Sequence, residues 1–518
     1  MPDPIQKITL SRVASRLLAA RPELAAELDA ANPFPIQEIE RALAGAGGDD
    51  ESAFKRRLRR LRQRVLLHVM ARDFAGGADP ASAADSAGRL AEVCGTMSDL
   101  AEASIRSALA WANRQFSAAH GTPRTSSGAP CDLIVVGMGK LGGRELNVSS
   151  DIDLVFLYPE EGETDGARPL TNHEYFDRVG RKTISLLADR TEDGFVFRVD
   201  MRLRPYGASG PLVASFEALE SYLVSQGREW ERYAWIKARP VTGDDAPGTG
   251  DNRHAELDAI VRPFVYRKYL DFGTLAAMRR LHAEVRREVE RRELAEHIKL
   301  GPGGIREIEF VAQALQLVRG GREPALAVRP TLEVLARLAE RRMLPEAAAR
   351  ELAESYVFLR QVEHRLQYLD DAQTHTLPDA ADDRARVAAM AGFESWESFY
   401  ARLGEFRAQV TRHFQNVFAE SQGNGLEDVW QDDRDAAATV LAGRGFRDAQ
   451  ATAARLAATR SSQRYAALSE DSKRRVDQLV PTLAAAAAEM PDPDATLARG
   501  LDLVEAIARR AAYLALLA

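Results

Sequence analysis

Three aspartates carry the clearest chemical signal in this sequence of 518 residues. Asp151 and Asp153 are two residues apart in the strand-like run DIDLVFLY, so both side chains leave the same face of the strand. Neighbouring carboxylates repel each other unless a cation lies between them, and Mg²⁺ prefers carboxylate oxygens. The pair therefore predicts a Mg²⁺ site, with Mn²⁺ as the alternative metal. Transfer of a phosphoryl or nucleotidyl group is the chemistry that such a site supports, because the metal offsets charge on the phosphate oxygens.

A second predicted strand, Phe197–Pro205, supplies a third carboxylate. Its alternation places Asp200 on one face together with Arg198, Arg202 and Arg204, while the apolar residues face the core. A carboxylate flanked by guanidinium groups suits a metal-bound phosphate better than it suits packing. We therefore predict that three residues act as catalytic metal ligands: Asp151, Asp153 and Asp200.

Glycines precede the aspartate pair. A seven-residue spacer separates Gly142-Gly143 from Asp151, and glycine lets backbone N–H groups approach phosphate oxygens closely. The Gly301–Gly304 turn opens a predicted helix and makes a second candidate anion site. The full set of predicted nucleotide- or phosphate-binding residues is Gly142, Gly143, Ser149, Ser150, Lys140, Arg202, Arg204, Lys237, Arg239 and Arg306.

Several of these residues have an equally simple structural explanation. Lys237 and Arg239 share one face of a predicted strand in WIKARPV, where they could form a surface strand edge instead of a phosphate site. Arg306 and Glu309 are one helical turn apart and could pair with each other. The GxG at Gly137–Gly139 is a poor dinucleotide fingerprint, because the following acidic residue comes too soon.

The elements that must position these residues form an α+β, mostly helical chain. Residues 1–118 are predicted to be helical, 119–300 to form an α/β domain, 301–420 a helical bundle, and 421–518 a further alanine-rich helical region. The basic run at 55–64 lies on a helix and is interpreted as a solvated face that touches another domain, with a nucleic-acid patch as the alternative. His364, on an otherwise apolar helix, could be catalytic, but a structural role is favoured.

Composition excludes several classes of protein. The net charge of -7 argues against a general affinity for nucleic acid or for anionic membranes. No stretch approaches the roughly 18–20 apolar residues that span a bilayer. Two cysteines, Cys94 and Cys131, are too few for a disulfide framework and indicate a reducing compartment. We expect a cytoplasmic protein that binds neither nucleic acid nor membrane.

The motifs together resemble a known family. The arrangement of Gly142-Gly143, the spacer and the aspartates is similar to nucleotidyltransferases of the DNA-polymerase-β type. Longer runs resemble the bifunctional glutamine synthetase adenylyltransferase/adenylyl-removing enzyme; they are GMGKLGGRELNVSSDIDL, DMRLRPYGASGPL, REWERYAWIKARPVTGD, IKLGPGGIREIEF and EHRLQYLDDAQTHTLP. The resemblance implies a polymerase-β-like domain flanked by helical domains.

That enzyme has two nucleotidyltransferase-like halves, and this chain is similar to the N-terminal, adenylyl-removing half. We therefore expect a fragment that lacks the second half. The implied reaction is phosphorolysis: inorganic phosphate attacks the tyrosine-linked AMP of glutamine synthetase and releases ADP. The implied partners are adenylylated glutamine synthetase and the PII signal protein in its uridylylated form, with glutamine opposing removal.

Two alternatives remain open at the level of the residues. The aspartates would serve the forward reaction, in which ATP adenylylates glutamine synthetase, equally well. A nucleotide-sensing regulatory module could also keep this fold, although a pure sensor would have little need for all three aspartates.

Overall fold

A small mixed sheet carries the aspartates in the computed structural model, which describes residues 7–45, 48, 50–75, 83–243, 252–267, 291, 294–418, 426–430 and 433–507. The sheet follows the order β3-β2-β1-β5, and β4 also pairs with β2. Its strands are β1 (Ile134–Gly137), β2 (Ile152–Tyr158), β3 (Val199–Asp200), β4 (Val213–Ser215) and β5 (Arg239–Pro240).

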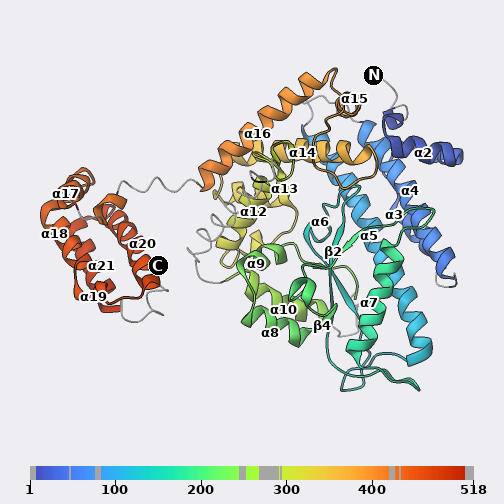
Figure 1. The fold of residues 1–518 in the computed structure, drawn as a ribbon, viewed down its shortest axis with the longest axis horizontal. Coiled ribbons are helices and arrows are strands. Elements are labelled where there is room, and N and C mark those ends of the chain that lie inside the picture. The colour runs from blue at the N-terminus through green and yellow to red at the C-terminus, as the bar shows by residue number, and fades with distance from the viewer. Residues whose placement is uncertain are drawn as a thin grey trace. The chain divides into compact units, whose positions relative to one another are not determined.

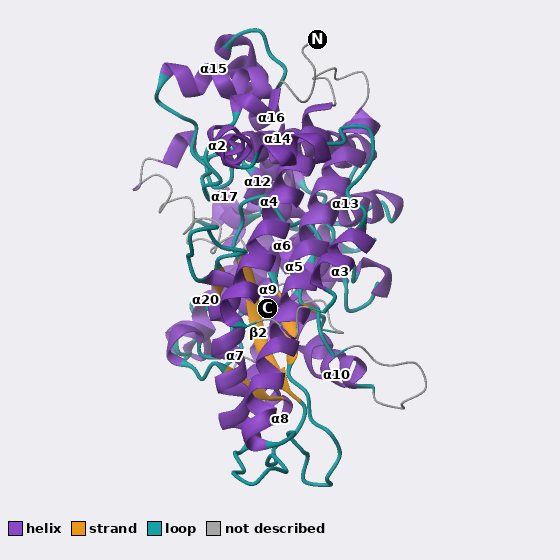
Figure 2. Ribbon diagram, turned by 90° about the vertical axis from the view of Figure 1, so that its right-hand side faces the viewer, coloured by secondary structure: helices purple, strands orange, loops and turns teal. Residues whose placement is uncertain are grey.

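Strand β2 occupies the centre of this sheet. It pairs antiparallel with β1 on one side, and on the other side it pairs in parallel with β3 near its start and with β4 near its end. Both β1 and β2 are nearly continuous apolar runs, and only Asp153 among their residues is not fully buried. Runs of this kind form strands covered on both faces, which Figure 2 shows as orange arrows among purple helices. The predicted strand DIDLVFLY is confirmed.

The helices that precede the sheet in the sequence are α2 (Arg12–Ala20), α3 (Ile36–Leu43), α4 (Glu51–Ala75) and α5 (Ala83–His120), joined by short 3₁₀ turns at Ile8–Leu10 and Pro22–Glu27. They pack on one another, and α4 and α5 also contact the helix that follows β2. Helix α7 (Asn172–Ala188) connects β2 to β3 and packs on α5 (Figure 1). It begins at a capping box in which Thr171 and Glu174 satisfy each other's backbone N–H groups, as sequences of this pattern predict.

The helices that follow the sheet complete the first unit. They are α8 (Phe216–Ser225), α9 (Glu229–Trp235), α10 (Arg253–Val265), α12 (Ile305–Arg319), α13 (Thr331–Glu340), α14 (Glu346–Tyr368), α15 (Ala381–Met390) and α16 (Trp396–Phe418). Helix α14 contacts α5, α12 and α13, and many of its residues are fully buried. It therefore forms the central axis of this helical region.

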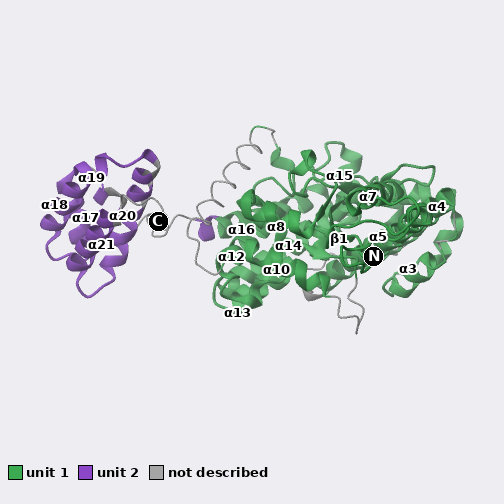
Figure 3. Ribbon diagram, turned by 90° about the horizontal axis from the view of Figure 1, so that it is seen from below, with its two compact units in different colours: residues 1–414 green, residues 415–518 purple. Residues whose placement is uncertain are grey.

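The chain divides into two compact units, Met1–Phe414 and Gln415–Ala518 (Figure 3). The second unit holds the helices α17 (Arg434–Gly443), α18 (Ala449–Arg460), α19 (Gln463–Ala466), α20 (Glu470–Ala488) and α21 (Pro493–Ile507). They enclose an apolar core of their own, which includes Leu441, Val480 and Leu501. The apolar helix expected at the end of the chain lies largely outside the described residues. The predicted fold class, α+β and mostly helical, is confirmed.

The basic helix α4 differs from its predicted solvated face. Arg59 is fully buried and donates to the backbone carbonyls of Gly194, Leu186 and Asp189, at the end of α7 and the turn that follows. Arg62 is also buried and forms a two-bonded ion pair with Asp371 at 2.7 Å. Arg59 fastens α4 to the end of α7, and Arg62 fastens it to the segment after α14. Arg56 and Arg60 of the same run are about half exposed, so the predicted solvated face is correct for these two residues and wrong for Arg59 and Arg62. Among the described residues, no helix is long and apolar enough to cross a membrane.

Candidate active site

The structure brings the three aspartates together at one end of β2. Asp153 and Asp200 are register partners in the parallel pair of β2 with β3, so their side chains leave the same face of the sheet. The backbone N–H of Ile152 donates to the backbone carbonyl of Arg198 at 2.9 Å, and this bond holds the two strands together here. Asp151 directly precedes β2 and is half-buried like Asp153.

Electrostatic repulsion among these carboxylates is strong. Burial, together with the charges of Asp151 and Asp200, raises the pKa of Asp153 to about 6. Burial and the neighbouring carboxylates both disfavour the ionised form of Asp153, and a bound cation would offset that cost. The cluster is therefore suited to binding a positively charged group.

Gly139 lies directly against this cluster. It has a φ of +51°, and a Cβ added to it would approach Oδ2 of Asp153 to 3.0 Å. A side chain at this position would be strained and would crowd the carboxylate. The second glycine of the GxG motif therefore serves access to Asp153, a role that the sequence reasoning missed because it judged the motif only as a dinucleotide fingerprint.

Asp200 has a cationic partner of its own. The Arg202 guanidinium makes three hydrogen bonds to the two oxygens of Asp200, at distances from 2.5 to 3.0 Å, and its backbone N–H adds a fourth. Burial opposes ionisation of Asp200, but these hydrogen bonds outweigh it and lower the pKa of the carboxyl. Arg202 is largely exposed, so it can swing away when a phosphate or a metal engages Asp200.

The three carboxylates are the ligand type that a hard divalent cation prefers, but their side chains must move before they could bind one ion together. Among the described residues, no group of three or more His, Cys, Asp or Glu side chains already surrounds a common point closely enough to hold a metal ion. Two of the three carboxylates are register partners, and the third leaves the same strand face. Release of Asp200 from Arg202 would free both of its oxygens for a metal ion.

Most of the predicted phosphate-binding cations are instead neutralised within the protein. Lys140 donates to both oxygens of Glu363 on α14, at 2.9 and 3.0 Å. Lys237 is buried and donates to Glu145 at 2.6 Å, and Arg239 donates to Glu102 at 2.5 Å. These contacts do not favour the predicted role, because a cation committed to a buried carboxylate is a weak ligand for phosphate. Lys237 also follows helix α9 and does not share a strand face with Arg239.

The segment after Asp200 is a turn, so the predicted strand over Phe197–Pro205 is wrong beyond Asp200. Arg204 does not point toward the aspartates but donates to backbone carbonyls of its own loop, including those of Met201 and Pro211. Arg198 donates to the carbonyl of Ser149 and to its hydroxyl oxygen. These arginines shape the loops around the site.

The predicted serines and glycines also have structural roles. Ser149 is buried and its backbone N–H donates to the side chain of Gln367, and Ser150 is buried beside it. The N–H groups of Gly142 and Gly143 donate to the carbonyls of Met138 and Gly139, so neither is free for phosphate. A Cβ on Gly142 would lie 1.9 Å from the carbonyl oxygen of Lys237, which explains the requirement for glycine there.

The backbone N–H groups of the Gly301–Gly304 turn are likewise bonded within the protein and do not offer an anion site. The N–H groups of Gly304, Ile305 and Arg306 donate to backbone carbonyls of the same turn, and that of Gly303 donates to Glu307. Arg306 is half-buried, and its charge acts on Tyr233. The suggested pair of Arg306 with Glu309 does not form, since Glu309 pairs with Lys237 at 3.6 Å.

Two family models match separate parts of this chain. Residues 5–254 match the family model described as glutamate-ammonia ligase adenylyltransferase, and residues 278–418 match that described as GlnD PII-uridylyltransferase. The chain resembles a bifunctional enzyme along almost its whole length. The bifunctional glutamine synthetase adenylyltransferase/adenylyl-removing enzyme of Chromobacterium violaceum is 51% identical over 98% of this chain and 55% of its own length.

Two further relatives carry the same name. The protein of Aromatoleum aromaticum is 50% identical over 98% of this chain and 53% of its own length, and that of Ralstonia nicotianae is 46% identical over 98% and 56%. The chain therefore spans about half the length of the curated relatives that it matches. The predicted resemblance to the bifunctional adenylyltransferase/adenylyl-removing enzyme is confirmed.

Lys299 is a cation near the aspartates that the sequence reasoning missed. It belongs to the uridylyltransferase-like segment, whereas the aspartates belong to the adenylyltransferase-like segment, and its charge lowers the pKa of Asp153 against the larger effect of burial. Lys299 is half-buried, and no side-chain partner of its ammonium is found within the part of the chain that the structure describes. Its place two residues before Gly301 was the signal that the sequence offered.

His297 holds the backbone of Lys299. Its Nδ1 accepts the N–H groups of Lys299 and Leu300, at 3.2 and 3.0 Å. Burial, together with the charges of His375 and Lys299, lowers the pKa of His297 to about 4, so the ring stays neutral and can accept these bonds near pH 7. The ring also stacks on His375 at a centroid distance of 5.2 Å.

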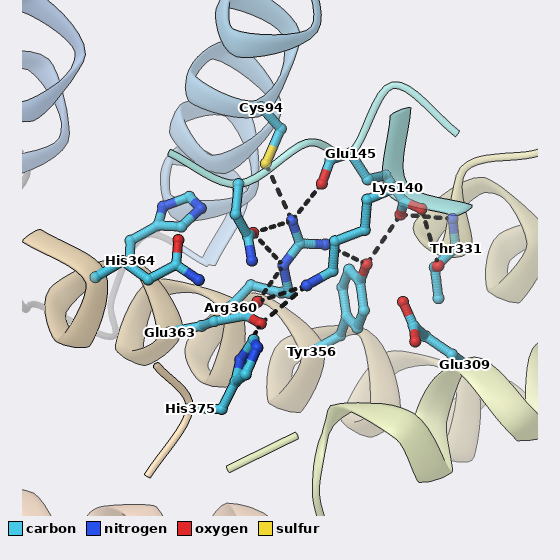
Figure 4. A network of polar contacts seen from close by, with 12 residues as sticks. Cys94, Lys140, Glu145, Glu309, Thr331, Tyr356, Arg360, Glu363, His364 and His375 are labelled. Carbon is cyan, nitrogen blue, oxygen red and sulfur yellow. Dashed lines mark hydrogen bonds and ion pairs between the residues drawn. The ribbon is translucent and has the colours of Figure 1, made fainter. Parts of the chain in front are cut away.

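A buried polar network joins the two family-matched segments (Figure 4). At its centre, Glu363 is fully buried and lies within 3.1 Å of Arg360, Lys140 and His375. Burial opposes ionisation of Glu363, yet these charges hold its pKa well below its usual range. Arg360 continues the network to the carbonyl of Glu145 and to Asn147, both on the segment that leads to Asp151. The helical segment thereby fixes the loop that carries the aspartates.

His364 belongs to a separate buried cluster. It is fully buried, and its Nδ1 lies 3.4 Å from Oδ2 of Asp73 on α4. Burial lowers its pKa, and Arg365 and Tyr368 contact the same carboxylate. The favoured structural interpretation of His364 therefore agrees with its position between α4 and α14.

Proposed function

We propose that this chain removes AMP from an adenylylated tyrosine of glutamine synthetase by phosphorolysis. The single observation that carries the proposal is the convergence of Asp151, Asp153 and Asp200, with Lys299 beside them, in a chain similar to bifunctional adenylyltransferase/adenylyl-removing enzymes. The name of the relatives includes both addition and removal of the adenylyl group. We assign removal because the motifs resemble the N-terminal half of that enzyme.

The reaction suits a site without a protein nucleophile. An oxygen of inorganic phosphate attacks the phosphorus of the tyrosine-linked AMP, the bond from phosphorus to the tyrosine oxygen breaks, and ADP leaves. Tyrosine, with an ordinary pKa of about 10, is a good leaving group as its phenolate, which then takes up a proton. Mg²⁺ bound by the three aspartates would offset charge on the phosphoryl oxygens.

The chain's own residues would position the two anions. Lys299 contributes the positive charge that draws phosphate toward the carboxylates, and His297 fixes the loop that presents it. Arg202 is the exposed cation nearest Asp200, and we propose that it transfers from that carboxylate to a phosphate oxygen. Both groups act without any change in their own covalent bonds.

The test is an assay of the chain with adenylylated glutamine synthetase, Mg²⁺ and phosphate. We expect ADP release from the wild-type chain and none from Asp153→Asn, which keeps the shape of the side chain but removes its charge. Transfer of AMP from ATP onto unmodified glutamine synthetase, with no release of ADP in the first assay, would assign the forward direction instead.

We also propose regulation by the uridylylated PII signal protein and a cytoplasmic location. The first is supported by the match of residues 278–418 to a PII-uridylyltransferase model. The second is supported by Cys94 and Cys131, which are both buried free thiols, as a reducing compartment favours. Stimulation of ADP release by uridylylated PII, and none by the unmodified form, would support the regulatory assignment.

A further inference from the structure

Tyr206 has a backbone conformation that tyrosine rarely adopts. Its φ of 61° and ψ of 11° lie in the left-handed region, where a Cβ is unfavourable. Its neighbour Gly207 also has a positive φ, of 59°. Residues held in such conformations persist only where the surrounding structure enforces them, and they gather at ligand-binding sites.

Arg204 enforces the conformation of this loop. Its guanidinium donates to the carbonyls of Met201 at 2.7 Å, Ala208 at 3.1 Å and Pro211 at 3.0 Å. Gly210 adds a second constraint, because a Cβ there would lie 2.1 Å from the carbonyl oxygen of Pro205. The loop is therefore tied at both ends around Tyr206.

The ring of Tyr206 is nevertheless open to solvent. The residue is 58% exposed, although the loop could have presented a small residue such as glycine without strain. Its only ring contact among the described residues is an edge-on contact with Tyr222, at a centroid distance of 4.5 Å. Tyr222 is itself fixed, since its hydroxyl donates to Glu231 at 2.6 Å. One side of Tyr206 is thus supported and the rest remains available for a ligand.

Tyr206 is close to Asp200 in the sequence. Tyr206 follows Asp200 by six residues, which could span about 20 Å if extended. Two successive turns, closed by the bonds from Arg204 N–H to Met201 and from Gly207 N–H to Arg204, shorten that reach considerably. The backbone of Tyr206 therefore lies well within about 20 Å of Asp200, on the loop that leaves the aspartate cluster.

We propose that Tyr206 stacks on the adenine ring of the adenylyl group whose phosphate lies at the three aspartates. Aromatic side chains bind nucleobases through their faces, and a ring that is already rigid loses little freedom on binding. The proposal rests on the proposed function only in requiring an adenylylated substrate, so it holds for either direction of the reaction.

The experiment measures AMP binding to the full chain by titration calorimetry in the presence of Mg²⁺. We expect Tyr206→Ala to weaken AMP binding about tenfold, the order of one lost base–aromatic stack, and Tyr206→Phe to retain it. Tyr206→Gly should unfold at the wild-type temperature or above it, because glycine accepts the left-handed backbone, and should bind AMP as weakly as Tyr206→Ala. Val224→Ala, which removes a side chain that is 84% exposed on α8, is the matched control and should bind AMP normally.

Unchanged AMP affinity in Tyr206→Ala and Tyr206→Gly would overturn this proposal. A loss seen only with an adenylyl-tyrosine peptide, and absent with AMP, would place the tyrosine ring there and would also overturn it. No action of the wild-type chain on adenylylated glutamine synthetase, with AMP binding that still depends on Tyr206, would refute the proposed function alone, so the two failures are distinguishable.

Discussion

At the scale of single residues, the ionised carboxylate of Asp153 destabilises the fold, and the same carboxylate is a predicted metal ligand. Its folded-state pKa of about 6 lies above the ordinary value of 3.8, so the folded chain holds its proton more tightly than the unfolded chain does. The stabilising contribution of this carboxyl is therefore complete below pH 3.8 and is lost as pH rises through 6. Above that pH, the ionised carboxylate destabilises the metal-free protein by about 3 kcal/mol.

Asp153→Asn should consequently be more stable than the wild type at pH 7 without divalent metal. We expect a gain of about 2–3 kcal/mol in the free energy of unfolding by urea denaturation, and a smaller gain at pH 5. Added Mg²⁺ should stabilise the wild type and not the variant. An unchanged free energy of unfolding would show that the carboxylates do not repel each other.

Lys299 should matter for rate rather than for folding. Replacement of Lys299 with alanine removes a half-buried charge beside Asp153, and we expect kcat/KM for ADP release to fall by about 100-fold with little change in Tm. Lys299→Arg should recover part of the rate. Lys473→Ala, in the second unit, is the control and should have wild-type kinetics.

His297 provides a separate test of how Lys299 is held. Asparagine can accept N–H groups two and three residues ahead, as the imidazole does here, whereas leucine cannot. We expect His297→Leu to reduce kcat/KM toward the level of Lys299→Ala and His297→Asn to retain most of it. Equal activity of the two variants would contradict the positioning role.

At the scale of elements, α14 links the helical region to the sheet through Glu363. Glu363→Gln leaves the buried charges of Lys140 and Arg360 without full compensation, and we expect a loss of about 3–5 kcal/mol in the free energy of unfolding. The control is Glu351→Gln on the same helix, whose carboxylate is partly exposed and pairs with Arg412 and His413 near the surface, so its loss should cost about 1 kcal/mol. Similar losses in both variants would contradict a special role for the buried network.

The elements also show which parts of the site a sequence can reveal. The strand DIDLVFLY follows from its apolar, β-branched run, and the structure confirms a strand over Ile152–Tyr158. The ion-pair partners of Lys140 and Lys237 could not be predicted from the neighbouring sequence. Lys140 finds Glu363 more than 200 positions away, and Lys237 finds Glu145, so both cations were neutralised by residues that only the tertiary fold brings near. Gly142 and Gly143 were predicted to approach phosphate, but a glycine is equally expected where the backbone packs closely, as at Gly142.

At the scale of the whole molecule, the two units have separate apolar cores. The aspartates, Lys299 and the network around Glu363 all lie in the first unit. A chain ending at Phe418 should therefore retain the unfolding transition of the first unit and the basal release of ADP, measured by calorimetry and by the removal assay. Loss of folding in this shortened chain would show that the second unit is required for the first.

Phosphorolysis at the three aspartates is the central claim, and labelled phosphate tests it most directly. Adenylylated glutamine synthetase is incubated with the chain, Mg²⁺ and [³²P]phosphate, and the nucleotide product is separated. The predicted result is [³²P]ADP from the wild type and none from Asp153→Asn. Release of unlabelled AMP, or an equal yield of [³²P]ADP from the variant, would contradict the claim.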